Sequence, residues 1–236
     1  MNRLRIALVA DLHGNRAATL ALEKDLKKTC PNRIICLGDV VGKGPMSDFT
    51  FDWAFANCDM VIGGNWDYGV GRRLFPKDEP YWVQLGPERL RKLDALPMEA
   101  EITFSGRSIR LIHGRPVMKT LIGSGASREE IDPLFIKPDG SRWDVVAYAD
   151  AHRHGMRVIN PGLFFNCGSV GNALGLPLCC YALMEGEDGP DKADFEVRFR
   201  QLEYDKALAL QDAADHPNIP RIDTFIREIQ TGLYSR

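Results

Sequence analysis

The sequence predicts an α/β fold in which two mixed β-sheets pack together with helices on their outer faces. Residues 6–63 alternate between short apolar runs and helical segments, which is typical of parallel strands joined by crossovers. The later part of the chain has apolar runs separated by tight turns, which indicates hairpins. In addition, an Asp, Asn or His residue closely follows five of the apolar runs.

The first part of the chain predicts strand, helix and strand in repetition. Ile6–Ala10 is an apolar run with the length of a buried strand. Asn15 can cap a following helix that ends near Thr29, because Pro31 lies just beyond it. The other elements expected here are strands at 33–37 and 59–63 and a helix at 49–57.

The later part of the chain predicts short strands and interrupted helices. Residues 68–96 have a helical composition broken by prolines, and Pro87 is expected to begin a helix of its own. Ser105-Gly-Arg and Pro161-Gly162 are predicted turns. The expected elements are strands at 101–104, 108–112, 145–148, 158–160, 163–166 and 179–184, an edge strand at 195–200, a short helix at 127–135 and amphipathic helices near the C-terminus.

Composition favours one domain over residues 1–236. The chain of 236 residues is 44% hydrophobic, and no low-complexity linker divides it. The motifs occupy residues 5–185, and we expect residues 190–236 to add a strand and helices. A net charge of −2 and a pI near 6.2 give no strong signal for nucleic acid or membrane binding. Because the N-terminus lacks the pattern of a signal peptide, we expect a cytoplasmic protein.

The six cysteines show no C-x-x-C spacing, so they predict neither a zinc knuckle nor a redox motif. Cys36, Cys179 and Cys180 lie within apolar runs, where a free cysteine packs as a small hydrophobic side chain. Cys167 lies in a glycine-rich loop, and we expect it to pack as well.

The polar residues that follow the apolar runs are of the types that bind divalent metals. The candidate ligands are Asp11, His13, Asp39, Asn65, His113, Asp150 and His152. They are expected to converge at one edge of a sheet, where open α/β folds bind ligands. Oxygen and nitrogen donors without a thiolate favour Mn, Fe, Zn or Co. Asp39 is the natural carboxylate to bridge two ions.

Each of these residues also has a simpler explanation when taken alone. An Asp or Asn after a strand commonly forms a turn, and a single His before Gly is usually a loop histidine with a satisfied hydrogen bond. Five such clusters, all at strand ends, favour a metal site over five unrelated turns.

As an ordered set, the motifs of this chain are similar to those of the calcineurin-like metallophosphoesterase superfamily, and most of all to its small bacterial members. Those members carry D-x-H-G-N, G-D-V-V-G-x-G-P, G-N-x-D, H-G-x-P and N-P-G-S-V-G. The corresponding segments here are Asp11–Asn15, Gly38–Pro45, Gly64–Asp67, His113–Pro116 and Asn166–Gly171.

The resemblance implies a sandwich of two mixed sheets and two divalent ions. It implies a first site formed by Asp11, His13, Asp39 and His152. It implies a second site formed by Asp39, Asn65, His113 and the residue at position 150. The carboxylate of Asp150 would harden the second site, so we expect Mn or Fe, with Zn, Co or Mg as alternatives.

Two positions depart from the pattern of the family. Asp150 stands where the family usually has a histidine, and a carboxylate there reduces the positive charge of a two-metal site. Trp66 stands where many members have a catalytic histidine, and an indole cannot protonate a leaving alkoxide at neutral pH. Trp66 is either a packing residue beside the cleft or a lid for a base. His154 is the candidate proton donor in its place.

Three further residues are candidates for substrate binding. Asn15 can contact phosphate at the N-terminus of its helix as well as cap that helix. Arg115 can bind a phosphate with its forked guanidinium, and Lys43 can do so with its ammonium group.

The sequence therefore predicts a dinuclear metal-dependent phosphoesterase in which a metal-bridging hydroxide attacks the phosphorus. The expected substrate is a phosphorylated small molecule or nucleotide: a phosphomonoester, a phosphodiester or a dinucleoside polyphosphate. The alternative is a catalytically weak or inactive scaffold that uses the fold for protein interaction. A homo-oligomer is compatible with the amphipathic C-terminal segment.

Overall fold

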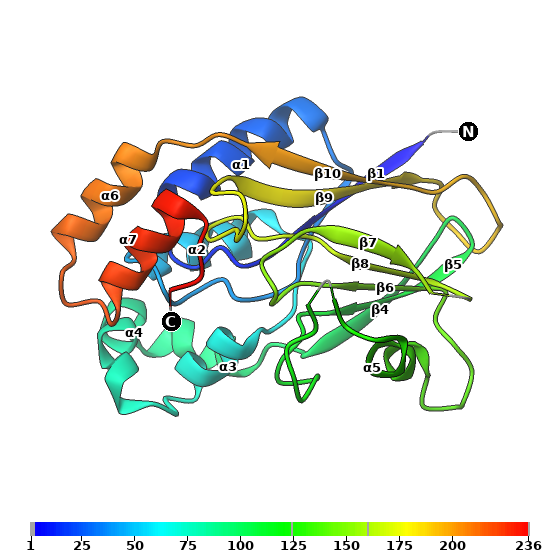
Figure 1. Ribbon diagram of the computed structural model, residues 1–236, viewed down its shortest axis with the longest axis horizontal. Coiled ribbons are helices and arrows are strands. Elements are labelled where there is room, and N and C mark those ends of the chain that lie inside the picture. The colour runs from blue at the N-terminus through cyan, green and yellow to red at the C-terminus, as the bar shows by residue number, and fades with distance from the viewer. Residues whose placement is uncertain (1–2, 124, 160, 236) are drawn as a thin grey trace.

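Two five-stranded mixed sheets face each other at the centre of the computed structural model, which describes residues 3–123, 125–159 and 161–235 (Figure 1). The first sheet has the order β10-β9-β1-β2-β3 and the second the order β4-β5-β6-β8-β7. Their bounds are β1 Leu4–Val9, β2 Arg33–Cys36, β3 Met60–Val61, β9 Cys179–Gly186 and β10 Glu196–Leu202, and β4 Glu99–Phe104, β5 Arg107–Ile112, β6 Val145–Tyr148, β7 Gly155–Val158 and β8 Leu163–Asn166. The predicted pair of mixed sheets is confirmed.

Each sheet contains three neighbouring parallel strands. These are β1, β2 and β3 in the first sheet and β5, β6 and β8 in the second. The hairpin of β4 and β5, the pair β7 and β8, and the pair β9 and β10 are antiparallel. Parallel strands end at the same edge of their sheet. Because the two sheets face each other, the loops that follow these six strands can meet at one end of the sandwich.

The helices lie outside the two sheets. Their bounds are α1 Arg16–Thr29, α2 Ser47–Asn57, α3 Asn65–Gly71, α4 Glu79–Asp94, α5 Arg128–Ile131, α6 Lys206–Asp215 and α7 Ile222–Thr231, with short 3-10 helices at Pro76–Asp78 and Asp132–Phe135. Figure 1 shows α1 and α2 beside the first sheet and α5 beside the second. Asn15 caps α1 as predicted, because its side chain accepts a hydrogen bond from the backbone amide of Ala18 at 3.0 Å.

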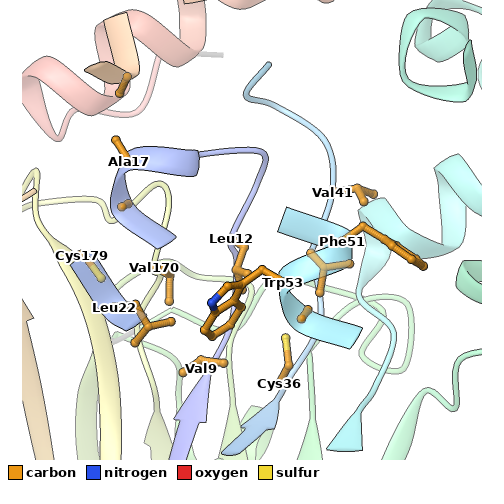
Figure 2. Packing of buried hydrophobic residues seen from close by; sticks show 14 of the residues in the cluster. Val9, Leu12, Ala17, Leu22, Cys36, Val41, Phe51, Trp53, Val170 and Cys179 are labelled. Atoms are coloured by element: carbon orange, nitrogen blue, oxygen red, sulfur yellow. The ribbon is translucent and has the colours of Figure 1, made fainter. Parts of the chain in front are cut away.

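Strand β1 alternates between two cores, as a strand in the middle layer must. Ala7 and Val9 pack toward the helices, whereas Ile6 and Leu8 belong to the core between the two sheets. Figure 2 shows Leu22 and Trp53 from the helical layer around Val9. The four cysteines at 36, 167, 179 and 180 are free and buried, which confirms that they pack in the interior.

The structure differs from the predicted elements at two strands. Strand β3 covers only two residues; beyond it the amide of Ile62 still donates to the carbonyl oxygen of Cys36, and the amide of Gly63 donates to that of Pro97. Strand β7 covers Gly155–Val158, where it pairs with β8, whereas the sequence predicted a strand at 158–160. Residue 160 lies outside the described residues. In α4 the backbone kinks at Gly86, and Pro87 begins the second helical part as predicted.

Among the helices of the described residues, none is both long enough and apolar enough to cross a membrane.

Candidate metal centre

The candidate ligands lie in the loops that follow the parallel strands. β1 leads to Asp11 and His13, β2 to Asp39, β3 to Asn65, β5 to His113, and β6 to Asp150 and His152. Backbone hydrogen bonds hold these loops against one another. The amide of Asp11 donates to the carbonyl oxygen of Gly38 at 2.9 Å, and the amide of Ala149 donates to that of His113 at 2.7 Å. The amide of Val170, after β8 of the second sheet, donates to the carbonyl oxygen of Ala10, after β1 of the first sheet, at 2.9 Å, so the loops of the two sheets are joined.

Backbone strain is concentrated in these loops. Ten described non-glycine residues have a positive φ, and six of them are candidate site residues: Asp11, His13, Asp39, Lys43, Asp150 and His152. A left-handed backbone costs such residues about 1–2 kcal/mol each. Strain of this kind persists where the surrounding structure imposes it, and it clusters at functional sites.

Asp11 is the centre of the cluster. Its carboxylate is fully buried, and neither oxygen has a hydrogen-bond partner among the described residues. Three histidine Nε2 atoms surround its Oδ1 atom, at 3.6 Å for His13, 3.3 Å for His152 and 3.8 Å for His113. A buried carboxylate without hydrogen bonds is costly unless a positive charge lies next to it.

All three histidines present the same nitrogen to this cluster. Their Nδ1 atoms donate to backbone carbonyl oxygens, at 3.2 Å from His13 to Val41, 2.7 Å from His113 to Leu37 and 2.7 Å from His152 to Asn172. Because a carbonyl oxygen can only accept, each Nδ1 carries the proton. The Nε2 lone pair of a neutral ring is then directed at the cluster, which is the usual arrangement of metal-binding histidines.

The residues fit a bound cation at this point. The Nε2 atoms of His13 and His152 are 3.2 Å apart. Two lone pairs at this distance repel each other unless a cation or a proton lies beside them. Among the described residues, the ligand atoms form two groups that share Asp11: one with His13 and His152, and one with Asp39 and His113.

Asp39 belongs to the second group and also approaches His13 of the first. Its Oδ1 atom accepts a hydrogen bond from the backbone amide of Trp66 at 2.8 Å. Its Oδ2 atom lies 3.5 Å from Nε2 of His13 and 3.4 Å from Nε2 of His113. The single atom Oδ2 therefore approaches one histidine of each group. Gly64 is required beside it, because a Cβ atom there would collide with Oδ1 of Asp39.

Asn65 lies between Gly64 and Trp66, both of which approach the Oδ1 atom of Asp39. Its Oδ1 atom is buried without a hydrogen-bond partner among the described residues. An amide oxygen in that state is available as a ligand for a hard cation.

The cluster carries a strongly negative potential. Burial lowers the pKa of His113, but the carboxylates of Asp39, Asp11 and Asp150 outweigh this effect and raise it to about 10. The imidazole therefore binds a proton more tightly than usual, which is the behaviour expected of a site built for positive charge.

Asp67 is a positioning residue that the sequence analysis placed in a motif but gave no role. Its carboxylate accepts hydrogen bonds from the backbone amides of Asp39 at 2.7 Å, Val40 at 3.0 Å and Gly64 at 3.0 Å. Burial and the neighbouring Asp39 raise its pKa to about 7. It joins the loop after β2 to the loop after β3. Its place in the G-N-x-D motif was the signal that could have found it.

Asp150 and Arg115 form a pair in the structure. The Oδ2 atom of Asp150 accepts from the backbone amide of Arg115 at 3.0 Å and from its Nε at 2.8 Å, and Oδ1 accepts from Nη2 at 2.6 Å. Burial raises the pKa of Asp150, but the hydrogen bonds and charges of Arg115 and His113 outweigh it and the net shift is downward.

Lys43 reaches the first group of ligands. Its Nζ atom lies 3.3 Å from Nε2 of His152 and donates to Oδ1 of Asn172 at 2.9 Å. Asn172 thus contacts both His152 and Lys43, a role that its position after the glycine-rich loop did not reveal.

Asn15 and His154 are held in other contacts. The side-chain amide of Asn15 donates to the carbonyl oxygen of Gly171 at 2.8 Å, in addition to its capping bond. The Nε2 atom of His154 lies 2.9 Å from Nε2 of Gln201, and its ring packs 5.2 Å from that of Phe199 on β10. Burial lowers the pKa of His154. The structure does not bring His154 into the ligand cluster.

Trp66 packs at the base of the site. Its ring meets that of His13 edge-on at 6.0 Å and that of Tyr81 at 6.0 Å. A Cβ atom at Gly42 would collide with the indole. The contacts of the indole with His13, Tyr81 and Gly42 support the explanation that Trp66 is a packing residue beside the cleft. Its side chain also lines the cavity above.

A cavity of about 700 Å³ opens over the cluster. Its floor includes Asp39, Asn65, Asp150 and His152, and His154 is absent from the described residues that line it. Its positively charged lining residues are Lys43, Lys77, Arg115, Arg153 and Arg221, and its aromatic ones are Trp66, Phe75 and Tyr234. Tyr234, which follows α7, lines the same opening as Phe75.

The fold and the cluster define a class of protein in which two sheets present a metal centre at their shared edge. Residues 4–189 match the model of the calcineurin-like phosphoesterase superfamily domain, and the chain belongs to this superfamily.

Two solved structures share the fold of this chain, and one further protein is similar to it in sequence. A metallophosphoesterase from Sphaerobacter thermophilus has a TM-score of 0.75 at 21% identity, covering 98% of this chain and 100% of that one. A hypothetical protein from Pyrococcus horikoshii has a TM-score of 0.73 at 20% identity, covering 96% and 97%. An uncharacterised protein from Methanocaldococcus jannaschii is 26% identical over 231 residues, covering 87% of this chain and 90% of that one.

Proposed function

We propose that this chain is a metal-dependent phosphoesterase that binds two divalent ions. The observation that supports this most directly is the buried carboxylate of Asp11, which has no hydrogen-bond partner among the described residues and faces three histidine Nε2 atoms. Such a group needs compensating positive charge. Hydrolysis of phosphoric esters is the chemistry of the superfamily to which the chain belongs.

We assign the first ion to Asp11, His13, His152 and the bridging Asp39, and the second to Asp39, Asn65 and His113. Bound there, the ions would lower the pKa of a coordinated water and offset the charge of a phosphate. Oxygen and imidazole donors without a thiolate favour Mn or Fe, with Zn, Co or Mg as alternatives.

The protein's own cations take part in substrate binding. We assign Lys43 and Arg115 to the phosphate oxygens, because both line the cavity beside the ligand cluster and both carry a positive charge.

The cavity favours a phosphate ester that carries an aromatic group. Its volume of about 700 Å³ exceeds the need of a phosphate alone. Phe75 and Tyr234 line it with 52% and 62% of their surfaces exposed, so their rings are available to stack on a base or an aryl group. We therefore propose a nucleotide-like or aryl phosphoester as substrate.

The substrate should also have a good leaving group. Trp66 cannot donate a proton at neutral pH, and His154 contacts Gln201 and Phe199 instead of the ligand cluster. Protonation of the leaving oxygen is left to water, which suits phosphodiesters of phenols and phosphoanhydrides.

Removal of the shared ligands tests the proposal. Asp39→Ala and His113→Ala should each lower the kcat for bis-aryl phosphate hydrolysis at least about 1,000-fold, because each takes a side chain from the metal centre. The assay uses purified protein with Mn, Fe, Zn or Mg. Asp52→Ala is the matched control, because Asp52 is an exposed carboxylate paired with Arg89 outside the cavity.

Retained turnover in either ligand variant would overturn the mechanism. Wild-type protein that binds metal but hydrolyses neither aryl nor bis-aryl phosphate would support the scaffold alternative instead.

A further inference from the structure

Position 150 is where the superfamily pattern leads one to expect a ligand of the second metal. The carboxylate of Asp150 is instead turned toward the backbone and side chain of Arg115. Both of its oxygens accept hydrogen bonds from that residue, at 2.6–3.0 Å. Among the described residues, Asp150 belongs to neither group of converging ligand atoms.

Packing holds the carboxylate in this orientation. A Cβ atom at Gly114 would lie 2.7 Å from Cβ of Asp150 and 2.8 Å from its Oδ2 atom, so the carboxylate approaches the backbone as closely as only glycine permits. The side chain of Asp150 is 2% exposed, whereas that of Arg115 is 43% exposed. The buried partner is fixed, and the exposed partner faces the cavity.

We propose that Asp150 is not a metal ligand but a positioning residue that orients Arg115 as a phosphate-binding group. The second metal is then held by three side chains, Asp39, Asn65 and His113. This inference rests on the proposed function, because it concerns the same centre.

The geometry of the pair supports this role for Arg115. Its Nε and Nη2 atoms bind Asp150, and no hydrogen bond of the described residues uses its Nη1 atom. A guanidinium held along one side by a carboxylate presents its remaining N–H groups in a fixed direction. Arg115 also lines the cavity together with Asp39 and Asn65.

Two consequences distinguish this arrangement from an ordinary two-metal site. In the ligand assignment proposed above, the first ion has four side-chain ligands, whereas the second has three and should bind more weakly. A phosphate should contact Arg115 directly, so that loss of Arg115 weakens the binding of inorganic phosphate to the metal-loaded protein.

The test removes the pair as a neutral unit. Asp150→Ala combined with Arg115→Ala deletes one negative and one positive charge, so the net charge near the metals is unchanged. Calorimetric titration with Mn²⁺ should give a weaker class of site within about 3-fold of wild type, because no ligand is lost. Binding of inorganic phosphate to the Mn²⁺-loaded protein should fall about 10-fold or more.

The matched control is Asp52→Ala with Arg89→Ala, which deletes an Asp–Arg pair of the same geometry, at 2.8 and 2.7 Å, outside the cavity. It should leave both titrations unchanged. If the first double variant does not fold, Asp150→Leu with Arg115→Met replaces the pair at similar volume and carries the same expectations.

Loss of the weaker Mn²⁺ class, or its weakening by more than about 10-fold, in the cavity variant would show that Asp150 is a ligand and overturn the proposal. Unchanged phosphate binding would overturn it as well. Neither titration depends on turnover, so a wild-type protein that binds Mn²⁺ as expected and fails to hydrolyse esters contradicts only the proposed function.

Discussion

At the scale of the residue, the hydrogen bond of Nδ1 orients each imidazole ring so that its Nε2 atom faces the ligand cluster. The Nδ1 atoms of His13, His113 and His152 donate to backbone carbonyl oxygens that belong to distant loops. The sequence identifies the histidines but contains no signal for the carbonyl that each one contacts, because those partners are up to 76 residues away. The tautomer is therefore a property of the tertiary structure.

The protonation of His113 leads to a prediction at this scale. Its pKa in the folded protein is about 10, above the ordinary value of 6.5. The proton on His113 therefore stabilises the metal-free fold fully below about pH 6.5, and this contribution is lost as the pH rises through about 10. A metal needs the neutral ring, so binding must displace this proton.

The affinity for Mn²⁺ should accordingly rise about tenfold per pH unit between pH 6.5 and 8.5. Titration calorimetry at several pH values, in buffers of different ionisation enthalpy, measures both the affinity and the proton released. The control is His216→Gln, because His216 lies at the end of α6 outside the ligand cluster. An affinity that does not change with pH would contradict a protonated His113.

At the scale of the element, the strands and the first helix were predictable from the local pattern of apolar and polar residues. The two exceptions are strands β3 and β7, whose bounds depend on how they pair with neighbouring strands. The cap at Asn15, the turn at Ser105 and the edge position of β10 follow from short-range chemistry, and the structure has all three. β3 is shorter than its apolar run and leads into a segment where Gly63 bonds to Pro97, and β7 pairs with β8 from Gly155 to Val158. A partner strand is not visible in the strand's own residues.

One contact between elements lies outside the metal centre and supports a stability prediction. Asp25 on α1 accepts from Arg200 on β10, at 3.0 and 2.9 Å, and from the hydroxyl of Tyr181 on β9 at 2.9 Å. Burial raises the pKa of Asp25, but the hydrogen bonds from Arg200 and Tyr181 outweigh it, and the net shift is downward.

Arg200→Met should lower the free energy of unfolding at pH 7 by about 1.5–3 kcal/mol, because it leaves a buried carboxylate without its cation. Because the pKa of Asp25 is lower in the folded protein than in the unfolded chain, its contribution to stability is present above the pKa of the unfolded chain, near 4. This contribution is lost as the pH falls through the pKa of the folded protein. Urea unfolding should therefore show a smaller difference from wild type below about pH 4. Arg72→Met is the control, since its pair with Asp94 is exposed on both sides and contributes little. Equal losses in the two variants would contradict the argument.

At the scale of the whole molecule, the centre exists only because two sheets share an edge. The ligand cluster takes residues from loops of both sheets, and the cavity takes Phe75 from the segment before α4 and Tyr234 from the C-terminus. The buried carboxylate of Asp11, which has no hydrogen-bond partner among the described residues, weakens the metal-free fold, so metal binding should stabilise the molecule as a whole.

The thermal stability should respond to metal accordingly. Mn²⁺ at about 100 times its Kd should stabilise the fold by about 2.7 kcal/mol, which corresponds to a rise in Tm of roughly 5–10 °C for a domain of this size. EDTA should reverse the rise in a thermal melt followed by circular dichroism. Asp39→Ala should show little response, and an equal response in that variant would place the stabilising ion elsewhere.

The sequence could predict the two mixed sheets, the capped first helix and the set of ligand types after the strands. It could do so because hydrophobic periodicity and turn chemistry are local, and because the ordered motifs lie in one chain. The tertiary structure decided what these side chains contact. In the folded protein Asp39 accepts a hydrogen bond from the amide of Trp66, His154 packs against β10, and Asp150 pairs with Arg115. These outcomes depend on hydrogen bonds and packing between loops that only folding brings together.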